Sequence, residues 1–182
     1  MMCGNVTGRR TATRSARGAT LTSKQIRHEL TYDASLSDVA AMLRDPEFRE
    51  RVCEYQGVLR STVTVEPDGA GMRVRIDQVQ NAKGIPSFAT KFVGEEIQIV
   101  QDETWTSPER GRIEISIPGK PGDTLGTATL AESGGTTTET VDLTVKVSIP
   151  LVGGKLEGLI ADLLLKALKA ENAVGREWLA DR

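Results

Sequence analysis

Histidine and cysteine are scarce in this sequence, which has one histidine, His28, and two cysteines, Cys3 and Cys53. Catalysis by a Ser-His-Asp or Cys-His arrangement would have to use His28, and no nucleophile motif accompanies it. The cysteines have neither the spacing of a zinc site nor the number needed for a disulfide framework. We therefore predict no metal and no cofactor, and we interpret Cys53 as a small apolar residue within a helix.

Long apolar runs and a strong net charge are also missing. No segment approaches the roughly 18 apolar residues that a membrane-spanning helix requires. The arginines near the N-terminus are not followed by an apolar stretch, so no secretory signal is predicted. The formal net charge is only −2, which argues against nucleic acid as a partner. We expect a cytoplasmic protein without integral membrane association, either a monomer or a homodimer.

Residues 1–21 differ in composition from the rest of the chain. They are rich in Arg, Thr, Gly and Ala and contain almost no large apolar residues, which predicts a disordered basic tail. The remaining residues, 22–182, are enough for a single domain with a sizeable core. The chain has 18 glycines, a number that suits many turns between short elements.

Alternation of apolar and polar residues predicts a series of strands. At the start of this region Ile26, His28 and Leu30 alternate with Arg27 and Glu29. The predicted strands are 26–32, 58–66, 72–80, 95–106, 111–118, 123–132 and 136–149. Because their connections are of hairpin length, we expect an antiparallel sheet with one buried face and one face in water.

Two short helices are predicted between the first two strands. Ser35 followed by Asp38 resembles an acidic variant of the capping box and begins the first helix. Asp45 and Pro46 have the residue types of an N-cap and a first helical position, so they begin the second. The apolar face predicted for the second helix consists of Phe48, Val52 and Tyr55, and Gly57 ends it.

The C-terminal segment predicts one long amphipathic helix, Lys155–Ala180, and residues 85–93 predict a short helical or irregular crossing. The apolar face of the long helix is predicted to hold Leu156, Ile160, Leu163, Leu164, Ala167, Leu168, Val174 and Trp178. It is the one predicted element able to cover the buried face of the sheet. Small residues at Gly126, Ala128 and Ala167 suggest that helix and sheet do not fill the space between them.

This order of elements resembles the START-like superfamily, which includes polyketide cyclases and the birch-pollen allergen. Three segments also look like an uncharacterised bacterial family within it: 85–88 (IPSF), 103–105 (ETW) and 149–157 (IPLVGGKLE). The resemblance implies an α+β helix-grip fold, with a curved seven-stranded antiparallel sheet wrapped around the long C-terminal helix. It also implies a general role in holding apolar ligands, and it supplies no catalytic residue.

Glu171 and Glu103 are the polar candidates for a ligand site. Glu171 falls inside the apolar arc of the long helix, where a carboxylate requires a partner or a raised pKa. It either contacts a ligand or reaches water near an opening, or it pairs with an arginine of the sheet. Glu103 and Gln101 extend the face of Ile97 and Ile99, so they point either into a cavity or into water beyond the covered area.

The remaining candidates are apolar or less specific. Trp105 is interpreted as a core or rim aromatic, and His28 as a core or edge histidine whose one alternative is acid–base chemistry. The apolar walls of the site are predicted to include Ile99, Ile115, Leu164 and Leu168.

The leading hypothesis is therefore a protein that binds or carries a small hydrophobic or amphipathic molecule, such as a lipid or a polyketide, between sheet and helix. One alternative is a cyclase or dehydratase that uses Glu171 or His28 as a general acid–base. Another is a partner-binding module with a filled core.

Overall fold

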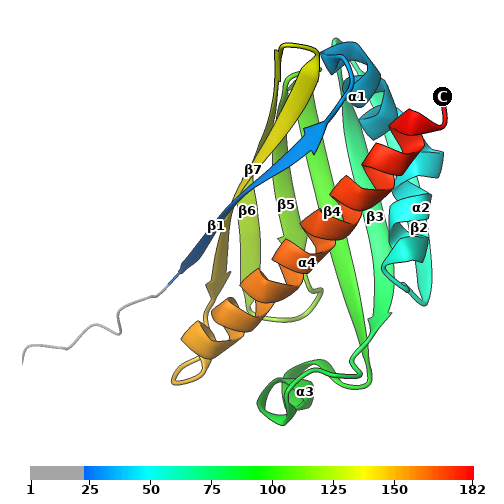
Figure 1. The fold of residues 1–182 in the computed structure, drawn as a ribbon. Coiled ribbons are helices and arrows are strands. Elements are labelled where there is room, and N and C mark those ends of the chain that lie inside the picture. The colour runs from blue at the N-terminus through cyan, green and yellow to red at the C-terminus, as the bar shows by residue number, and fades with distance from the viewer. Residues whose placement is uncertain (1–22) are drawn as a thin grey trace, which may run out of the picture.

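Seven strands form one curved antiparallel sheet in the computed structural model, which describes residues 23–182 (Figure 1). The strand order is β1-β7-β6-β5-β4-β3-β2, and every neighbouring pair is antiparallel. The strands are β1 Lys24–Tyr32, β2 Arg60–Asp68, β3 Gly71–Asn81, β4 Glu96–Ser107, β5 Arg110–Ser116, β6 Gly122–Ser133 and β7 Thr136–Val147. The predicted α+β helix-grip architecture is confirmed, while the predicted tail, residues 1–21, lies outside the described part of the chain.

The two short helices are α1, Leu36–Arg44, and α2, Pro46–Tyr55. Both begin at the predicted caps: the Ser35 hydroxyl accepts a hydrogen bond from the Asp38 backbone N–H, and Asp45 accepts one from that of Glu47. A third helix, α3, covers Ser87–Val93 and lies at the opposite end of the sheet from α1 (Figure 1).

The end of α2 explains why β2 begins two residues later than predicted. The Val58 backbone N–H donates to the Cys53 carbonyl, and the Gly57 N–H donates to that of Glu54. This pair of bonds is a Schellman motif, with Gly57 in the left-handed conformation at φ 70°. Val58 is therefore part of the helix ending rather than of the strand.

The long helix α4 covers Gly153–Ala180 and starts two residues before the predicted Lys155. Gly153 lies so close to β7 that an added Cβ would be 2.6 Å from the Val147 carbonyl oxygen. The Glu157 side chain then accepts a hydrogen bond from the Val147 backbone N–H at 3.0 Å. This contact ends β7 at Val147, two residues before its predicted end.

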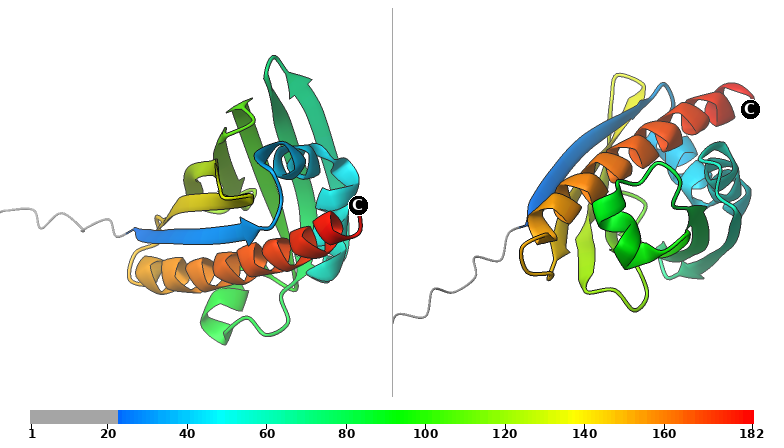
Figure 2. Two further views of the ribbon diagram at one scale, coloured as in Figure 1. Left: turned by 45° about the horizontal axis from the view of Figure 1, so that its top comes forward. Right: turned by 90° about the horizontal axis from the view of Figure 1, so that it is seen from below.

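Helix α4 crosses the concave face of the sheet and packs mainly against β1, with further contacts to β7, α1 and α2 (Figure 2). Its C-terminal half is held tightly, because an added Cβ at Gly175 would be 2.7 Å from the ring of the buried Tyr32. The close-packed part of the core lies at this end and includes Leu30, Tyr32, Val39, Met42, Leu43, Phe48, Val174 and Trp178.

Two residues assigned to apolar helix faces are instead exposed. Leu163 on α4 is 42% exposed and Tyr55 on α2 is 60% exposed. Both border a cavity, so the apolar stripes continue past the packed core to a region without close neighbours. Within residues 23–182, no helix has the length and apolar character needed to span a membrane.

Candidate functional site

A cavity of about 780 Å³ lies between the sheet and α4. Its walls come from the inner faces of β3, β4, β5 and β7, from the start of β6, from α2 and α3, and from the N-terminal and central turns of α4. The apolar lining includes Ile76, Ile97, Ile99, Ile113, Ile115, Leu143, Leu156, Leu164, Ala167 and Leu168. This volume is within the range of roughly 300–1,000 Å³ that small-molecule sites occupy.

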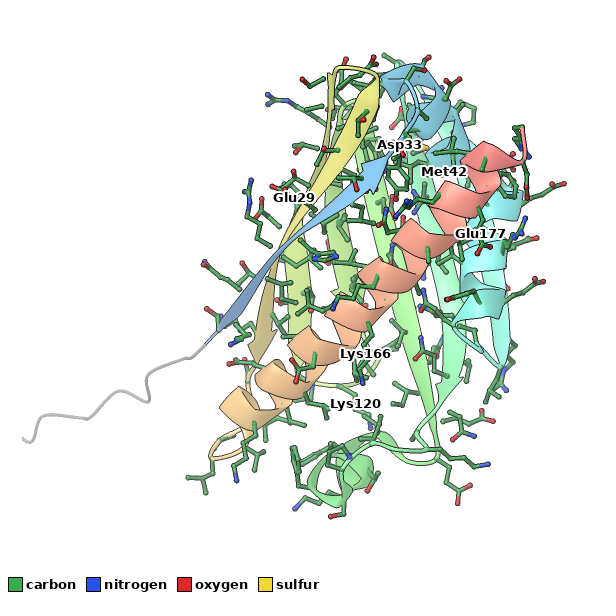
Figure 3. The ribbon with its side chains drawn as sticks, in the orientation of Figure 1. Glu29, Asp33, Met42, Lys120, Lys166 and Glu177 are labelled. Carbon is green, nitrogen blue, oxygen red and sulfur yellow. The ribbon has the colours of Figure 1, made fainter. Side chains whose placement is uncertain are left out.

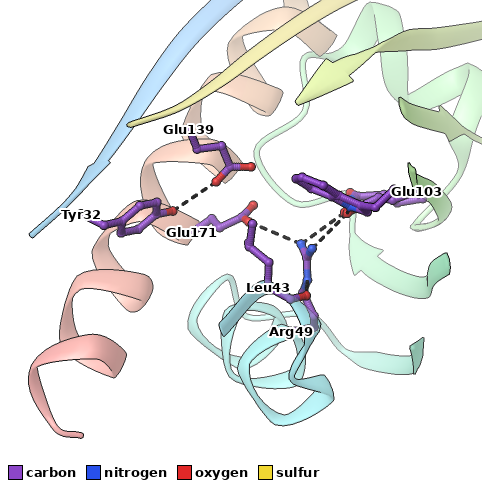
Figure 4. A network of polar contacts seen from close by, with 8 residues as sticks. Tyr32, Leu43, Arg49, Glu103, Glu139 and Glu171 are labelled. Carbon is purple, nitrogen blue, oxygen red and sulfur yellow. Dashed lines mark hydrogen bonds and ion pairs between the residues drawn. The ribbon is translucent and has the colours of Figure 1, made fainter. Parts of the chain in front are cut away.

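Arg49 on α2 is the centre of a polar cluster at one end of this cavity (Figure 4). Its side chain is buried, with 3% of the residue exposed. The guanidinium donates to both Glu103 oxygens, at 3.2 and 2.9 Å, and to the Glu171 Oε1 at 3.4 Å. Its Nε donates to the Leu43 carbonyl at 3.0 Å. One arginine therefore joins α2, β4 and α4.

Glu103 on β4 is the best-satisfied carboxylate of the cluster. Besides Arg49, it accepts hydrogen bonds from the Gln101 Nε2 and the Trp105 Nε1, each at 2.7 Å. The residue is 3% exposed. A buried, fork-to-fork pair of arginine and carboxylate with two further donors to the carboxylate satisfies Glu103, so Glu103 is the principal partner of Arg49.

Glu139 on β7 and Tyr32 on β1 complete the cluster. Glu139 is 3% exposed and lines the cavity, and the Tyr32 hydroxyl donates to its Oε2 at 3.4 Å. That distance is long for an O–H···O bond, which is normally about 2.7–2.8 Å. The Glu139 carboxyl is thus buried with only a weak partner within residues 23–182.

Burial raises the pKa of Glu139 well above its usual range, and the nearby Glu171 raises it further while Arg49 opposes the change. Burial likewise raises the pKa of Glu171, with Arg49 lowering it and Glu103 raising it. Burial also raises the pKa of the Tyr32 hydroxyl, and the negative charges of Glu139 and Glu171 raise it further. The two carboxyls therefore retain a proton at higher pH than exposed glutamates do.

The structure brings together most of the predicted site residues and separates two of them. Those that line the cavity are Glu171, Glu103, Ile99, Ile115, Leu164 and Leu168. Trp105 is outside the lining: it is buried behind Glu103 and packs on Gly111, where an added Cβ would be 2.7 Å from the indole. It supports the carboxylate and does not face the cavity.

His28 is also outside the lining. It lies on β1, opposite Val141 of β7, and is partly exposed. Helix α4 packs along β1, so the space over this strand is occupied and the cavity begins at β7. Of the three small residues, Ala167 lines the cavity, whereas Gly126 and Ala128 do not.

Sequence reasoning missed Arg49, Glu139 and Tyr32. A signal existed for Glu139, because it is two residues from Val141 and so has the same orientation as the buried residues of β7. A weaker signal existed for Arg49, which shares a helix face with Val52 and Cys53. Within residues 23–182, no group of three or more His, Cys, Asp or Glu side chains has a geometry that would hold a metal ion.

The raised pKa values of the carboxyls give a prediction for stability against pH. A carboxyl whose pKa is raised in the folded state contributes stability below its unfolded pKa, and this is lost as the pH rises through the folded pKa. Glu139→Gln removes one such group. The free energy of unfolding of this variant, relative to that of the parent, should therefore increase from pH 5 to pH 9. Each unit of elevation is equivalent to about 1.4 kcal/mol. Urea unfolding at several pH values measures this difference.

A matched control is Glu114→Gln, which changes an exposed carboxylate on β5. Its free energy of unfolding should remain within about 0.5 kcal/mol of the parent throughout. If the difference in free energy of unfolding between Glu139→Gln and the parent stays constant from pH 5 to pH 9, the proton assigned to Glu139 and Glu171 is contradicted.

Solved structures with this arrangement of elements come from different organisms. TTHA0849 from Thermus thermophilus has a TM-score of 0.62 and 21% identity, over 87% of this chain and 98% of that one. The Zhui aromatase/cyclase from Streptomyces sp. R1128 has a TM-score of 0.63 and 10% identity, over 88% of this chain and 96% of that one. At these identities the likeness is one of fold, and it is the START-like fold that the sequence predicted.

A relative in sequence is an uncharacterized protein of Mycobacterium tuberculosis (strain ATCC 25618 / H37Rv). It is 31% identical over an alignment of 111 residues, with a coverage of 57% of this chain and 63% of that protein. The match thus spans less than two thirds of the length of the curated relative. A family model described as "Protein of unknown function (DUF2505)" matches residues 27–179. With nearly the whole described chain inside that match, this protein belongs to the DUF2505 family.

Proposed function

We propose that this protein binds and carries a small amphipathic organic molecule in the cavity between the sheet and α4. The observation that carries the proposal is the cavity of about 780 Å³ itself, whose apolar walls lead to a buried polar cluster. A ligand site that is mostly apolar, with a few polar groups at one place, fixes the orientation of a ligand that is itself apolar with one polar end. The proposed ligand places its apolar body among the isoleucines and leucines.

The route of entry is proposed to lie at the opposite end from the cluster. Exposed residues there include Lys83 near α3, Lys120 between β5 and β6, and Lys166 on α4, and all three border the cavity. Figure 3 places Lys120 and Lys166 between the lower half of α4 and α3. The cluster end, in contrast, is closed by the packed core around α1 and α2.

The similar fold of the Zhui aromatase/cyclase agrees with a hydrophobic ligand class, since the name of that protein describes the formation of aromatic rings. Fold by itself does not determine function, so the ligand class rests on the cavity rather than on the likeness.

Blocking the cavity tests the proposal. Ala167 on α4 lines the cavity, and Ala167→Trp should fill part of it. Displacement of a hydrophobic fluorescent dye by candidate lipids and aromatic compounds measures binding. We expect affinity to fall at least about tenfold, equivalent to about 1.4 kcal/mol of lost contact.

The control is Lys169→Trp, on the exposed side of the same helix. It adds the same side chain outside the lining and should leave dye binding unchanged. Failure of the parent protein to bind any dye or ligand would overturn the proposal, and so would equal binding by the two variants.

Acid–base catalysis is a second candidate, favoured by the two carboxyls of raised pKa at one end of the cavity, Glu139 and Glu171. His28 would not act as the acid or base in such catalysis, because it lies outside the lining of the cavity. Mass spectrometry of a bound ligand before and after incubation with the protein tests it: an unchanged mass argues for a carrier.

A further inference from the structure

We propose that the closed end of the cavity recognises a protonated amine, so that the ligand is an amphipathic molecule with a cationic nitrogen at its inner end. Glu139 and Glu171 are the proposed acceptors. This inference rests on the proposed function, because it names the polar group of the ligand that the cavity would hold.

Acidic side chains outnumber basic ones in the cluster. Three carboxyl side chains, Glu103, Glu139 and Glu171, line this end of the cavity with a single arginine, Arg49. Arg49 and Glu103 already form a fork-to-fork pair at 2.9 and 3.2 Å. Once these two are matched, two carboxyls remain without a cation of their own. Their electrostatic preference is for a positive group.

Glu139 and Glu171 also have unused hydrogen-bond acceptor capacity. An ionised carboxylate has about four lone-pair positions. Among the described residues, Glu139 receives one hydrogen bond, from Tyr32 at 3.4 Å, and Glu171 receives one, from Arg49 at 3.4 Å. Both contacts are long, and both carboxyls line the cavity. Glu139 is buried from bulk water, so a donor that reaches it must come from a ligand or a trapped water molecule.

The same carboxyls disfavour an anionic headgroup at this end of the cavity. A carboxylate or phosphate headgroup would face Glu139 and Glu171, and the one nearby cation among the described residues is already shared with Glu103. An ammonium group has three donors and no acceptor. It complements Glu139 and Glu171 once they are ionised, and in that state they would repel an anion.

The groups that face the proposed amine come from five elements, as Figure 4 shows: Tyr32 of β1, Arg49 of α2, Glu103 of β4, Glu139 of β7 and Glu171 of α4. Before an amine binds, the raised pKa values of Glu139 and Glu171 favour a retained proton. An incoming ammonium replaces that proton, so its binding is coupled to proton release. Amine affinity should therefore rise from pH 5.5 to pH 8, below the pKa of about 10 of an alkyl amine, as for lysine.

The lysines at the open end offer a different arrangement, in which an anionic headgroup stays at Lys83, Lys120 and Lys166 and the apolar tail points inward. In that arrangement the tail would end against the buried carboxyls, which is unfavourable for both. The experiment includes this arrangement as an outcome.

The test compares decylamine, 1-decanol and decanoic acid as competitors of a cavity-bound dye at pH 7.5. These compounds share one chain length and differ only in the headgroup. We expect decylamine to bind at least about tenfold more tightly than 1-decanol, with decanoic acid weakest. Glu139→Gln and Glu171→Gln should each reduce the ratio of amine affinity to alcohol affinity. Glu29→Gln, an exposed carboxylate on β1, is the control and should change neither.

Calorimetry in two buffers of different ionisation enthalpy gives an independent measurement. Decylamine binding should release close to one proton, and 1-decanol binding none. Equal affinities for amine and alcohol would overturn the inference while leaving the proposed function intact. Tightest binding by decanoic acid would also overturn it and would favour the lysines at the open end. Binding of none of the three would overturn the inference, and failure of the protein to bind the dye as well would overturn both proposals.

Discussion

Replacing Arg49 with methionine is expected to lower the free energy of unfolding by about 3–5 kcal/mol, the usual result of removing one partner from a buried ion pair. Arg49 and Glu103 are each 3% exposed, and their closest atoms are 2.9 Å apart. Methionine fills a similar volume but supplies no positive charge. Glu103 would then remain in the core with only the Gln101 and Trp105 donors.

The replacement also removes the bridge between α2 and α4. Arg49 donates to Glu171 and to the Leu43 carbonyl, so methionine leaves both acceptors without that donor. Guanidinium chloride or urea unfolding followed by circular dichroism measures the loss. If the variant does not fold, the double variant Arg49→Met with Glu103→Gln provides the second measurement, because it removes both charges together and should recover part of the stability.

The matched control is Arg75→Met, which breaks an ion pair of similar length. Arg75 and Asp102 are 2.8 Å apart on the outer face of the sheet, with side chains 55% and 47% exposed. Such a pair contributes about 0–1 kcal/mol. Equal losses for the two arginine variants would contradict a structural role for the buried pair, as would a double variant that is less stable than Arg49→Met alone.

Replacing Phe48 with alanine is expected to cost about 3–5 kcal/mol as well, through a cavity rather than through a charge. Phe48 is fully buried, and its ring meets that of Trp178 edge-on, with centroids 5.7 Å apart at 65°. This contact fixes α2 against the C-terminal half of α4. Because Arg49 is the next residue on α2, loosening Phe48 should also broaden the orientation of the guanidinium.

Tyr55→Ala on the same helix is the control for Phe48→Ala. Tyr55 is 60% exposed, so its removal should change the free energy of unfolding by about 0.5 kcal/mol or less. A double-mutant cycle of Phe48 with Trp178 should return a coupling of about 0.5–1.5 kcal/mol for the aromatic pair. A Phe48→Ala loss no larger than that of Tyr55→Ala would mean that α2 is not held through this ring.

The polar cluster illustrates the limit of sequence reasoning. Glu171 can be identified as a candidate from the sequence alone, since a carboxylate within the apolar stripe of a helix is unusual. Its partner Arg49 is 122 residues away in the chain and sits on a helix whose sequence looks ordinary. Glu139 and Tyr32 are 107 residues apart and come from adjacent strands β7 and β1. The periodicity of a sequence predicts that a side chain points toward the interior, but it does not predict which other side chains lie next to that residue there.

His28 and Trp105 show the converse limit: an inward orientation predicted from the sequence does not place a side chain in the cavity. Both occupy inward-facing positions by alternation, and neither lines the cavity. Helix α4 packs along β1, the strand that carries His28, and the indole of Trp105 is covered through its contact with Gly111 and its hydrogen bond to Glu103. Whether an inward position is packed, or open to a ligand, depends on which element crosses it.

By itself the sequence determined the order and type of the elements, the antiparallel sheet and the covering helix. Those features follow from spacing along the chain: a period of two for strands, about 3.6 for helices, and turn residues between them. Only the tertiary structure decided that a cavity of about 780 Å³ remains and that Arg49, Glu103, Glu139 and Glu171 meet in its lining. The curvature of the sheet and the path of α4 across it set both, because they govern distances between residues far apart in the chain.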